Sequence, residues 1–140
     1  MAELSKQNLV DLAETKLADA NLLLDAGRCG NAYYLAGYVI ELMFKAILSS
    51  RFRADTLPNR EWSTKVYIHD FGKLADLALV KGELDQRTDS DPEFFARWQV
   101  VLQWNESSRY NSRDTDAARE LIEAIEHPEH GVLQWLRARL

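Results

Sequence analysis

The chain has 140 residues, of which 46% are hydrophobic and 28% are charged, as in an ordinary soluble globular protein with one core. Its formal net charge of −5 argues against non-specific binding to nucleic-acid backbones, which requires a basic surface, but not against a local basic patch. The single cysteine, Cys29, excludes an intramolecular disulfide and fits a reducing compartment. The first residues lack a signal-peptide core, and no stretch approaches the roughly 20 uncharged apolar residues of a membrane span. We therefore expect a cytoplasmic protein without membrane contact and with a single domain over residues 1–140.

The first helix is predicted from about Ser5 to Ala26. Apolar side chains recur there at helical spacing and form one face, namely Leu9, Leu12, Ala13, Leu17, Ala20, Leu23 and Leu24. Ser5 suits the N-cap position, and Gly27 suits the left-handed residue that follows a helix. Because only a tight turn precedes the next apolar stretch, we expect an antiparallel helical hairpin.

Residues 30–52 form the most apolar stretch of the chain, with Glu41 and Lys45 as the only charges in its middle. A helix that is apolar on every side must be surrounded by other elements, so this stretch is predicted to be the central helix of a bundle. Gly37 lowers its helix propensity by about 1 kcal/mol relative to alanine. That loss is tolerable where another helix crosses closely.

One stripe of this central helix follows the i, i+4, i+7, i+11 spacing and carries Tyr34, Tyr38, Glu41 and Lys45. Glutamate four residues before lysine is the favourable order for an ion pair within a helix. Inside an apolar helix both charges need partners, because an unpaired buried charge costs several kcal/mol. The two residues therefore form either an ion pair that fixes the core or part of a ligand site.

Residues 53–68 are polar, contain helix breakers and are predicted to be a loop, with Trp62 packed back on the bundle. A third helix is predicted from the N-cap Asp70 through Leu79. The polar run over residues 82–91 is predicted to break it.

A fourth helix is predicted to begin at Asp91, an N-cap followed by proline at the first helical position, and to reach about Asn105. Its predicted inner face comprises Phe94, Phe95, Trp98, Val101 and Leu102. A fifth helix is predicted to start near Thr115–Asp116 and to end at His127, before a proline. Residues 131–140 are predicted to form a last amphipathic segment. Since no strand pattern occurs, the fold is predicted to be all-α, an up-and-down bundle of four to five helices.

The sequence predicts neither a metal site nor a cofactor. Its three histidines form no HExxH motif, a single cysteine cannot form CxxC pairs, and phosphate-binding glycine loops are absent. His127 and His130 lie three residues apart with a glutamate beside each, and a helical turn would let them hold a metal together. Exposed turns often carry such groups without an ion.

Three segments, in this order and spacing, resemble the HEPN-domain family. The run YYLAGYVIELMFKAIL (residues 33–48), preceded by LLLDAGRCGNA, resembles the second helix and the turn before it. HDFGKLADLA, from His69, resembles the opening of the third helix, and SSRYNS, from Ser107 to Ser112, resembles the Arg-Tyr element before the last long helix. The resemblance extends from about Leu9 to the C-terminus and implies a HEPN-like helical bundle.

The resemblance implies a homodimeric module that binds a nucleotide or RNA, often beside a minimal nucleotidyltransferase partner in a toxin–antitoxin or defence locus. The ligand-binding residues to which it points are Tyr34, Glu41, Lys45, His69, Arg109 and Tyr110. Arg109 and Lys45 would contact phosphate. A base would stack on Tyr34 or Tyr110, and Glu41 would orient one of the two cations.

Nuclease members of the family carry an arginine followed, after four to six residues, by a histidine. These two groups can cleave RNA without metal, since histidine moves a proton of the ribose 2′-hydroxyl while arginine stabilises charge on the phosphate. Arg109 matches the arginine by context, but residues 114–116 contain no histidine, so the signature is broken. We therefore expect a non-catalytic or degenerate module. One alternative is a metal-independent ribonuclease that uses Arg109 with His69, and another is a structural protein-interaction module without a ligand.

Structural observations separate these alternatives. A solvent-open pocket lined by Arg109, Lys45 and His69 would favour binding or catalysis, whereas a dry cluster with every polar atom paired would favour a structural role. Dimerisation is implied by the resemblance. The two late amphipathic helices are compatible with it, and so are Trp104 and Trp135, which are candidates for exposed tryptophans.

Overall fold

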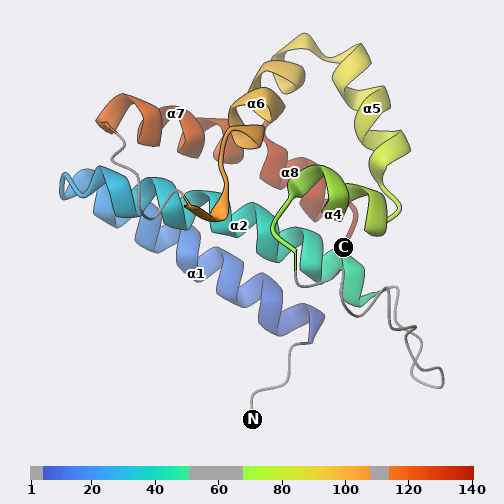
Figure 1. The fold of residues 1–140 in the computed structure, drawn as a ribbon, viewed down its shortest axis with the longest axis horizontal. Coiled ribbons are helices and arrows are strands. Elements are labelled where there is room, and N and C mark those ends of the chain that lie inside the picture. Colours follow the sequence, from blue (N-terminus) through green and yellow to red (C-terminus); the bar gives the residue numbers. More distant parts are fainter. Residues whose placement is uncertain (1–4, 51–67, 108–113) are drawn as a thin grey trace.

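The structure is a computed structural model that describes residues 5–50, 68–107 and 114–140, and these residues form seven helices and no strand (Figure 1). The helices are α1 (Lys6–Asp25), α2 (Cys29–Ser49), α4 (Phe71–Leu77), α5 (Lys81–Ser90), α6 (Pro92–Leu102), α7 (Thr115–Glu126) and α8 (Val132–Arg137). The all-α helical bundle predicted from the sequence is confirmed, but the described residues form seven helices where four to five were expected. α2 is its central helix and contacts α1, α4, α7 and α8.

The first two helices form the predicted antiparallel hairpin (Figure 1). Ser5 caps α1 by accepting a hydrogen bond from the Asn8 backbone amide at 3.1 Å. Gly27 adopts a φ of 78°, which reverses the chain between the two helices. The inner face predicted for α1 was wrong at Leu12, which is exposed. Most of the contacts that α1 makes are with α2, and fewer are with α7, so it buries a narrower stripe than the sequence suggested.

α2 also corrects the expectation that no stretch approaches a membrane span. By length and composition alone, Cys29–Ser49 is the one helix within the described ranges that could cross a bilayer. Yet 72% of its most apolar window is buried inside the bundle, as in the core helix of a soluble protein. Its apolar surface is thus largely accounted for by its neighbours.

Gly37 is explained by a side chain rather than by a crossing helix. The indole ring of Trp104 lies so close to Gly37 that an added Cβ would overlap three of its ring atoms. Trp104 also stacks on Phe71, with ring centroids 5.4 Å apart and an interplanar angle of 7°. Trp104 and Trp135, the candidates for exposed tryptophans, are each only 4% exposed, so that assignment was wrong.

α4 begins as predicted and ends early. Asp70 accepts a hydrogen bond from the Lys73 backbone amide at 3.0 Å and caps the helix. Leu79, just beyond α4, has a φ of 61°, a left-handed conformation that turns the chain toward α5. Of the loop predicted over residues 53–68, all but Ile68 lies outside the described residues.

The polar run that was expected to break a helix forms α5 instead. Its one buried side chain is Leu84. Its exposed side chains form two ion pairs. Lys81 pairs with Asp85 within the helix at 3.6 Å, and Glu83 pairs with Arg139 near the C-terminus at 2.7 Å. A helix anchored by one leucine lacks the apolar period by which helices are recognised in a sequence.

α6 starts at the predicted cap, since Asp91 accepts hydrogen bonds from the backbone amides of Glu93 and Phe94 at 3.1 Å. It ends at Leu102, three residues earlier than predicted. Two members of its predicted inner face are exposed, Phe95 by 47% and Leu102 by 40%. Each directly follows a buried residue, and successive residues lie about 100° apart around a helix, so only one of each pair can face the core.

Gly131, between α7 and α8, has no room for a side chain. A Cβ there would overlap the carbonyl oxygen of His127 and would lie 2.7 Å from that of Ile125. We expect Gly131→Ala to lower the free energy of unfolding by about 2 kcal/mol, because backbone atoms cannot move aside as a flexible side chain can. Urea denaturation followed by circular dichroism measures this loss.

Gly82→Ala is the matched control, since nothing lies within 4 Å of a Cβ at that position in α5. It is expected to be neutral or to stabilise by up to about 1 kcal/mol, through helix propensity. Equal effects of the two substitutions would contradict the packing described for Gly131.

Candidate functional site

Glu41, in the middle of α2, is the one charged side chain that is fully buried within the described ranges. Its carboxylate accepts a hydrogen bond from Lys45 Nζ at 3.3 Å, the ion pair that the four-residue spacing predicts. A second contact, 2.5 Å long, joins Glu41 Oε1 to His69 Nδ1. The buried carboxylate therefore ties α2 to the segment that enters α4.

His69 lies between two carboxylates. Its Nδ1 faces Glu41, and its Nε2 lies 3.0 Å from Glu106 Oε2, beyond the end of α6. Each ring nitrogen thus contacts a carboxylate oxygen, which accepts a hydrogen bond from a nitrogen that carries a proton. The ring thereby connects α2, α4 and the end of α6.

A pocket of about 410 Å³ opens beside His69, between the start of α4 and the end of α6. Apolar side chains such as Leu102 and Trp104 form part of its lining, and its charged groups are His69, Asp70, Lys73 and Glu106. Its volume lies within the range of small-molecule sites, and its lining is about equally polar and apolar. His69 is 39% exposed, so one edge of its ring is accessible while the other is fixed by a buried group.

Lys45 and Tyr34, both predicted to bind ligand, are not among the residues that line this pocket. Lys45 balances the charge of Glu41 from within α2. The Tyr34 ring packs against Trp104, with centroids 6.1 Å apart, and against Tyr38, with centroids 5.9 Å apart. Both residues therefore contact residues next to the pocket or in its lining: Lys45 contacts Glu41, and Tyr34 contacts Trp104.

The Glu41 carboxylate also influences a neighbouring hydroxyl group. Burial, the negative charge of Glu41 and the proximity of Tyr34 raise the pKa of Tyr38 above its ordinary value of 10.0. Tyr38 therefore stays neutral and presents only a phenol to the cluster.

Arg109 and Tyr110 lie outside the described residues. In the sequence they follow Glu106, at the edge of the pocket, by three and four positions. Their proposed contacts with phosphate and base therefore stay predictions.

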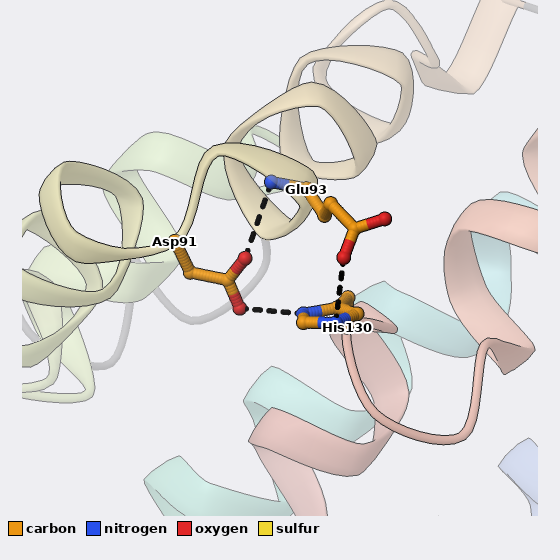
Figure 2. Close-up of side chains that lie close together, drawn as sticks. All are labelled: Asp91, Glu93 and His130. Carbon is orange, nitrogen blue, oxygen red and sulfur yellow. Dashed lines mark hydrogen bonds and ion pairs between the residues drawn. The ribbon is translucent and has the colours of Figure 1, made fainter.

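A second polar cluster joins the start of α6 to the turn between α7 and α8. His130 Nδ1 contacts Asp91 Oδ2 at 2.7 Å, and His130 Nε2 contacts Glu93 Oε2 at 2.8 Å (Figure 2). Like His69, His130 therefore bridges two carboxylates. From the sequence, His130 was noted only as a possible metal ligand together with His127. Its actual partners lie about 40 residues earlier in the chain, so no local pattern could reveal them.

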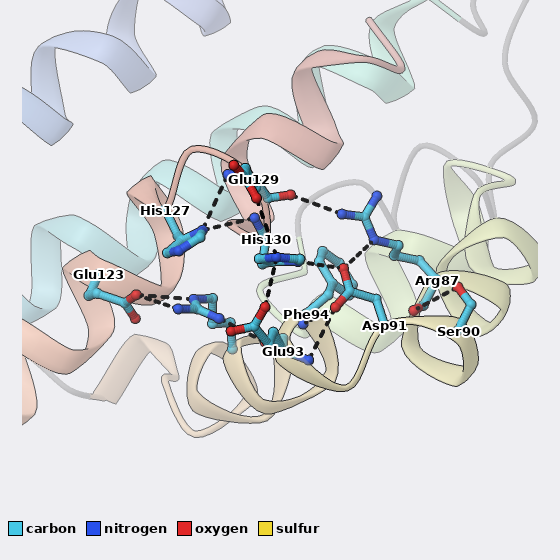
Figure 3. Close-up of polar contacts among 10 residues, drawn as sticks. Arg87, Ser90, Asp91, Glu93, Phe94, Glu123, His127, Glu129 and His130 are labelled. Carbon is cyan, nitrogen blue, oxygen red and sulfur yellow. Dashed lines mark hydrogen bonds and ion pairs between the residues drawn. The ribbon is translucent and has the colours of Figure 1, made fainter.

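Further hydrogen bonds hold this cluster in place (Figure 3). Arg87 Nε donates to Asp91 Oδ2 at 3.0 Å, and Arg87 also donates to the Glu129 carbonyl oxygen at 3.0 Å. His127 Nδ1 accepts from the backbone amides of Glu129 and His130. The turn after α7 is thus fixed from both sides.

By distance alone, the ligand atoms of Asp91, Glu93 and His130 could hold a metal ion, since they lie within 4.8 Å of one another. The two carboxylates contact opposite nitrogens of the ring, however, so one ion could not replace both hydrogen bonds. Arg87 adds a positive charge beside Asp91. We therefore interpret the cluster as a set of ion pairs and hydrogen bonds that connects helices, not as a metal centre.

The contacts of Asp91 predict how stability depends on pH. Burial alone raises the pKa of Asp91, but hydrogen bonds from His130, the Phe94 amide and Arg87 outweigh it and lower the pKa from 3.8 to about 2. The stabilisation is therefore complete above pH 3.8 and is lost as the pH falls toward 2. Asp91→Asn, which can still cap α6, should have a lower thermal midpoint than the wild type at pH 7. The difference should close between about pH 4 and pH 2.

Asp114→Asn is the control for this experiment. Asp114 caps α7 by accepting from the Ala117 amide at 2.8 Å and has no ion pair within the described ranges. Its substitution should therefore change the midpoint little. Equal midpoints for Asp91→Asn and the wild type at pH 7 would contradict a stabilising role for the Asp91 contacts.

Comparisons with known proteins give no functional assignment, so any assignment depends on the geometry of the structure. No family model matches the chain, and no curated protein or solved structure is significantly similar to it. The resemblance to HEPN domains, and the binding role that it implies, therefore stay predictions.

Proposed function

We propose that this chain is a non-catalytic, HEPN-like module that binds a nucleotide or RNA at the pocket beside His69. The observation that carries the proposal is the pocket itself, which places an oriented imidazole and a lysine beside apolar surface. A phosphate can accept hydrogen bonds from His69 and Lys73, and a base can lie on the apolar lining. The resemblance of the three sequence segments to HEPN domains supports the same ligand class.

Each residue takes a distinct role in this proposal. His69 and Lys73 contact the phosphate, and Arg109 adds a third cation, as the resemblance implies. Glu41 holds His69 from behind, and Lys45 balances the charge of Glu41. Tyr110 remains the candidate for stacking on a base.

The partners and the location follow from the resemblance and the composition. A homodimer, a minimal nucleotidyltransferase partner in a toxin–antitoxin or defence locus, and a cytoplasmic location are all part of the proposal. The exposed Phe95 and Leu102 on α6 are compatible with a contact surface for another chain.

Fluorescence anisotropy with a labelled single-stranded RNA at low salt tests the binding role. The wild type should bind, and His69→Asn and Lys73→Gln should each weaken binding at least fivefold. His130→Asn is the matched control, because it alters the other histidine that bridges two carboxylates, away from the pocket. The proposal fails if the wild type does not bind, or if the two pocket variants bind as tightly as it does.

A metal-independent ribonuclease is the second candidate, and one observation favours it. The contact between Glu41 and Nδ1 orients the ring so that Nε2 faces Glu106 in the pocket lining, where a histidine acting as a general base would meet its substrate. RNA cleavage in EDTA by the wild type, His69→Ala and Arg109→Ala tests this candidate. Cleavage that disappears in both variants would establish it, and inactivity of the wild type would exclude it.

A further inference from the structure

We propose that Glu106 competes with the ligand for His69 and is displaced when a phosphate binds. This inference rests on the proposed function of the His69 pocket. The Glu106 carboxylate lies 3.0 Å from His69 Nε2, where a phosphate oxygen would accept the same hydrogen bond. An anionic ligand and Glu106 therefore cannot both occupy this nitrogen.

The two carboxylates on His69 differ in how firmly they are held. Glu41 is fully buried within α2 and is bonded to Lys45 as well. The Glu106 side chain is 58% exposed, lies beyond the last residue of α6, and has His69 as its one ion-pair partner in the described part of the chain. Because exposed ion pairs contribute little to stability, Glu106 can leave while Glu41 keeps the ring in place.

The charges around the pocket indicate what kind of ligand can displace Glu106. With Glu106 in place, the carboxylates of Asp70 and Glu106 oppose the cation of Lys73. Once Glu106 leaves, His69 and Lys73 face the ligand, while Asp70 remains bonded to the amide that it caps. One lysine cation and one imidazole donor match one phosphodiester or monophosphate better than the dense charge of a triphosphate.

Replacing Glu106 with glutamine tests the competition, because glutamine keeps the size of the side chain and removes its charge. The probe is a 2′-deoxy dinucleoside monophosphate, which carries one phosphodiester and cannot be cleaved through a 2′-hydroxyl. Binding is followed by the ring-proton resonances of the histidines, with those of His69 assigned from their loss in His69→Asn. Glu106→Gln should lower the Kd roughly fivefold to tenfold, as expected for removing one negative charge beside the phosphate.

Glu93→Gln is the matched control, since Glu93 makes the equivalent contact to His130 Nε2 at 2.8 Å. It should leave the Kd unchanged, and only the His69 resonances should move on titration. If the wild type binds and Glu106→Gln binds equally or more weakly, the competition is refuted while the pocket's function stands. If neither protein binds, the proposed function itself is refuted. Binding by Glu106→Gln alone would support the competition, since Glu106 would then block the pocket of the wild type.

Discussion

Trp104→Ala is expected to lower the free energy of unfolding by roughly 3 to 5 kcal/mol, the largest loss expected from any single substitution considered for this protein. The Trp104 indole fills the space above Gly37 and stacks on Phe71, so its removal leaves a cavity between α2 and α4. Helices on both sides are fixed by other contacts and can close that cavity only in part. Urea denaturation monitored by circular dichroism gives the loss by linear extrapolation.

Two further variants make this expectation specific. Trp104→Phe should lose much less, because it retains an aromatic ring and because Trp104 Nε1 has no hydrogen-bond partner within the described ranges. Phe95→Ala, at a position that is 47% exposed, should change the free energy by less than about 1 kcal/mol. Similar losses for Trp104→Ala and Phe95→Ala would show that Trp104 is not the central packing residue.

Lys45→Met is expected to destabilise the fold by about 3 kcal/mol. The substitution leaves the fully buried Glu41 carboxylate with His69 as its remaining cationic partner, and a buried charge that loses a partner is costly. Methionine replaces the apolar part of the lysine side chain, so the loss reports mainly on the charge. The same denaturation experiment measures it.

A double-mutant cycle separates the charge effect from packing. In Glu41→Gln/Lys45→Met no buried carboxylate remains, so this variant should be more stable than Lys45→Met alone by about 2 kcal/mol. Strictly additive losses would mean that Glu41 and Lys45 do not depend on each other, contrary to the 3.3 Å contact between them.

Local signals in the sequence predicted local structure well. Ser5, Asp70 and Asp91 cap the helices that they were expected to cap, and Gly27 ends α1. A cap depends on residues within one turn, so its pattern is complete in a short segment. The Glu41–Lys45 ion pair is also a local feature that the sequence predicts, since a spacing of four residues brings the two side chains together on a helix.

Features that join distant segments could not be predicted in this way. The resemblance pointed to His69 as a ligand-binding residue, but no local pattern indicated that its partners are Glu41 and Glu106. Trp104 was expected on the surface, because nothing near it in the sequence indicates that it covers Gly37. Such contacts depend on how helices cross, which one chain's periodicity does not specify.

The position of α2 has a consequence for how the chain is made. Its apolar surface is covered in part by α7 and α8, which are synthesised long after it. At 5 to 20 residues per second, the 65 residues between Ser49 and Thr115 take about 3 to 13 s to translate. During that interval the nascent chain presents a helix whose length and composition would also suit a bilayer, with α1 as its local cover. During synthesis the chain therefore exposes apolar surface of α2 that the finished fold buries.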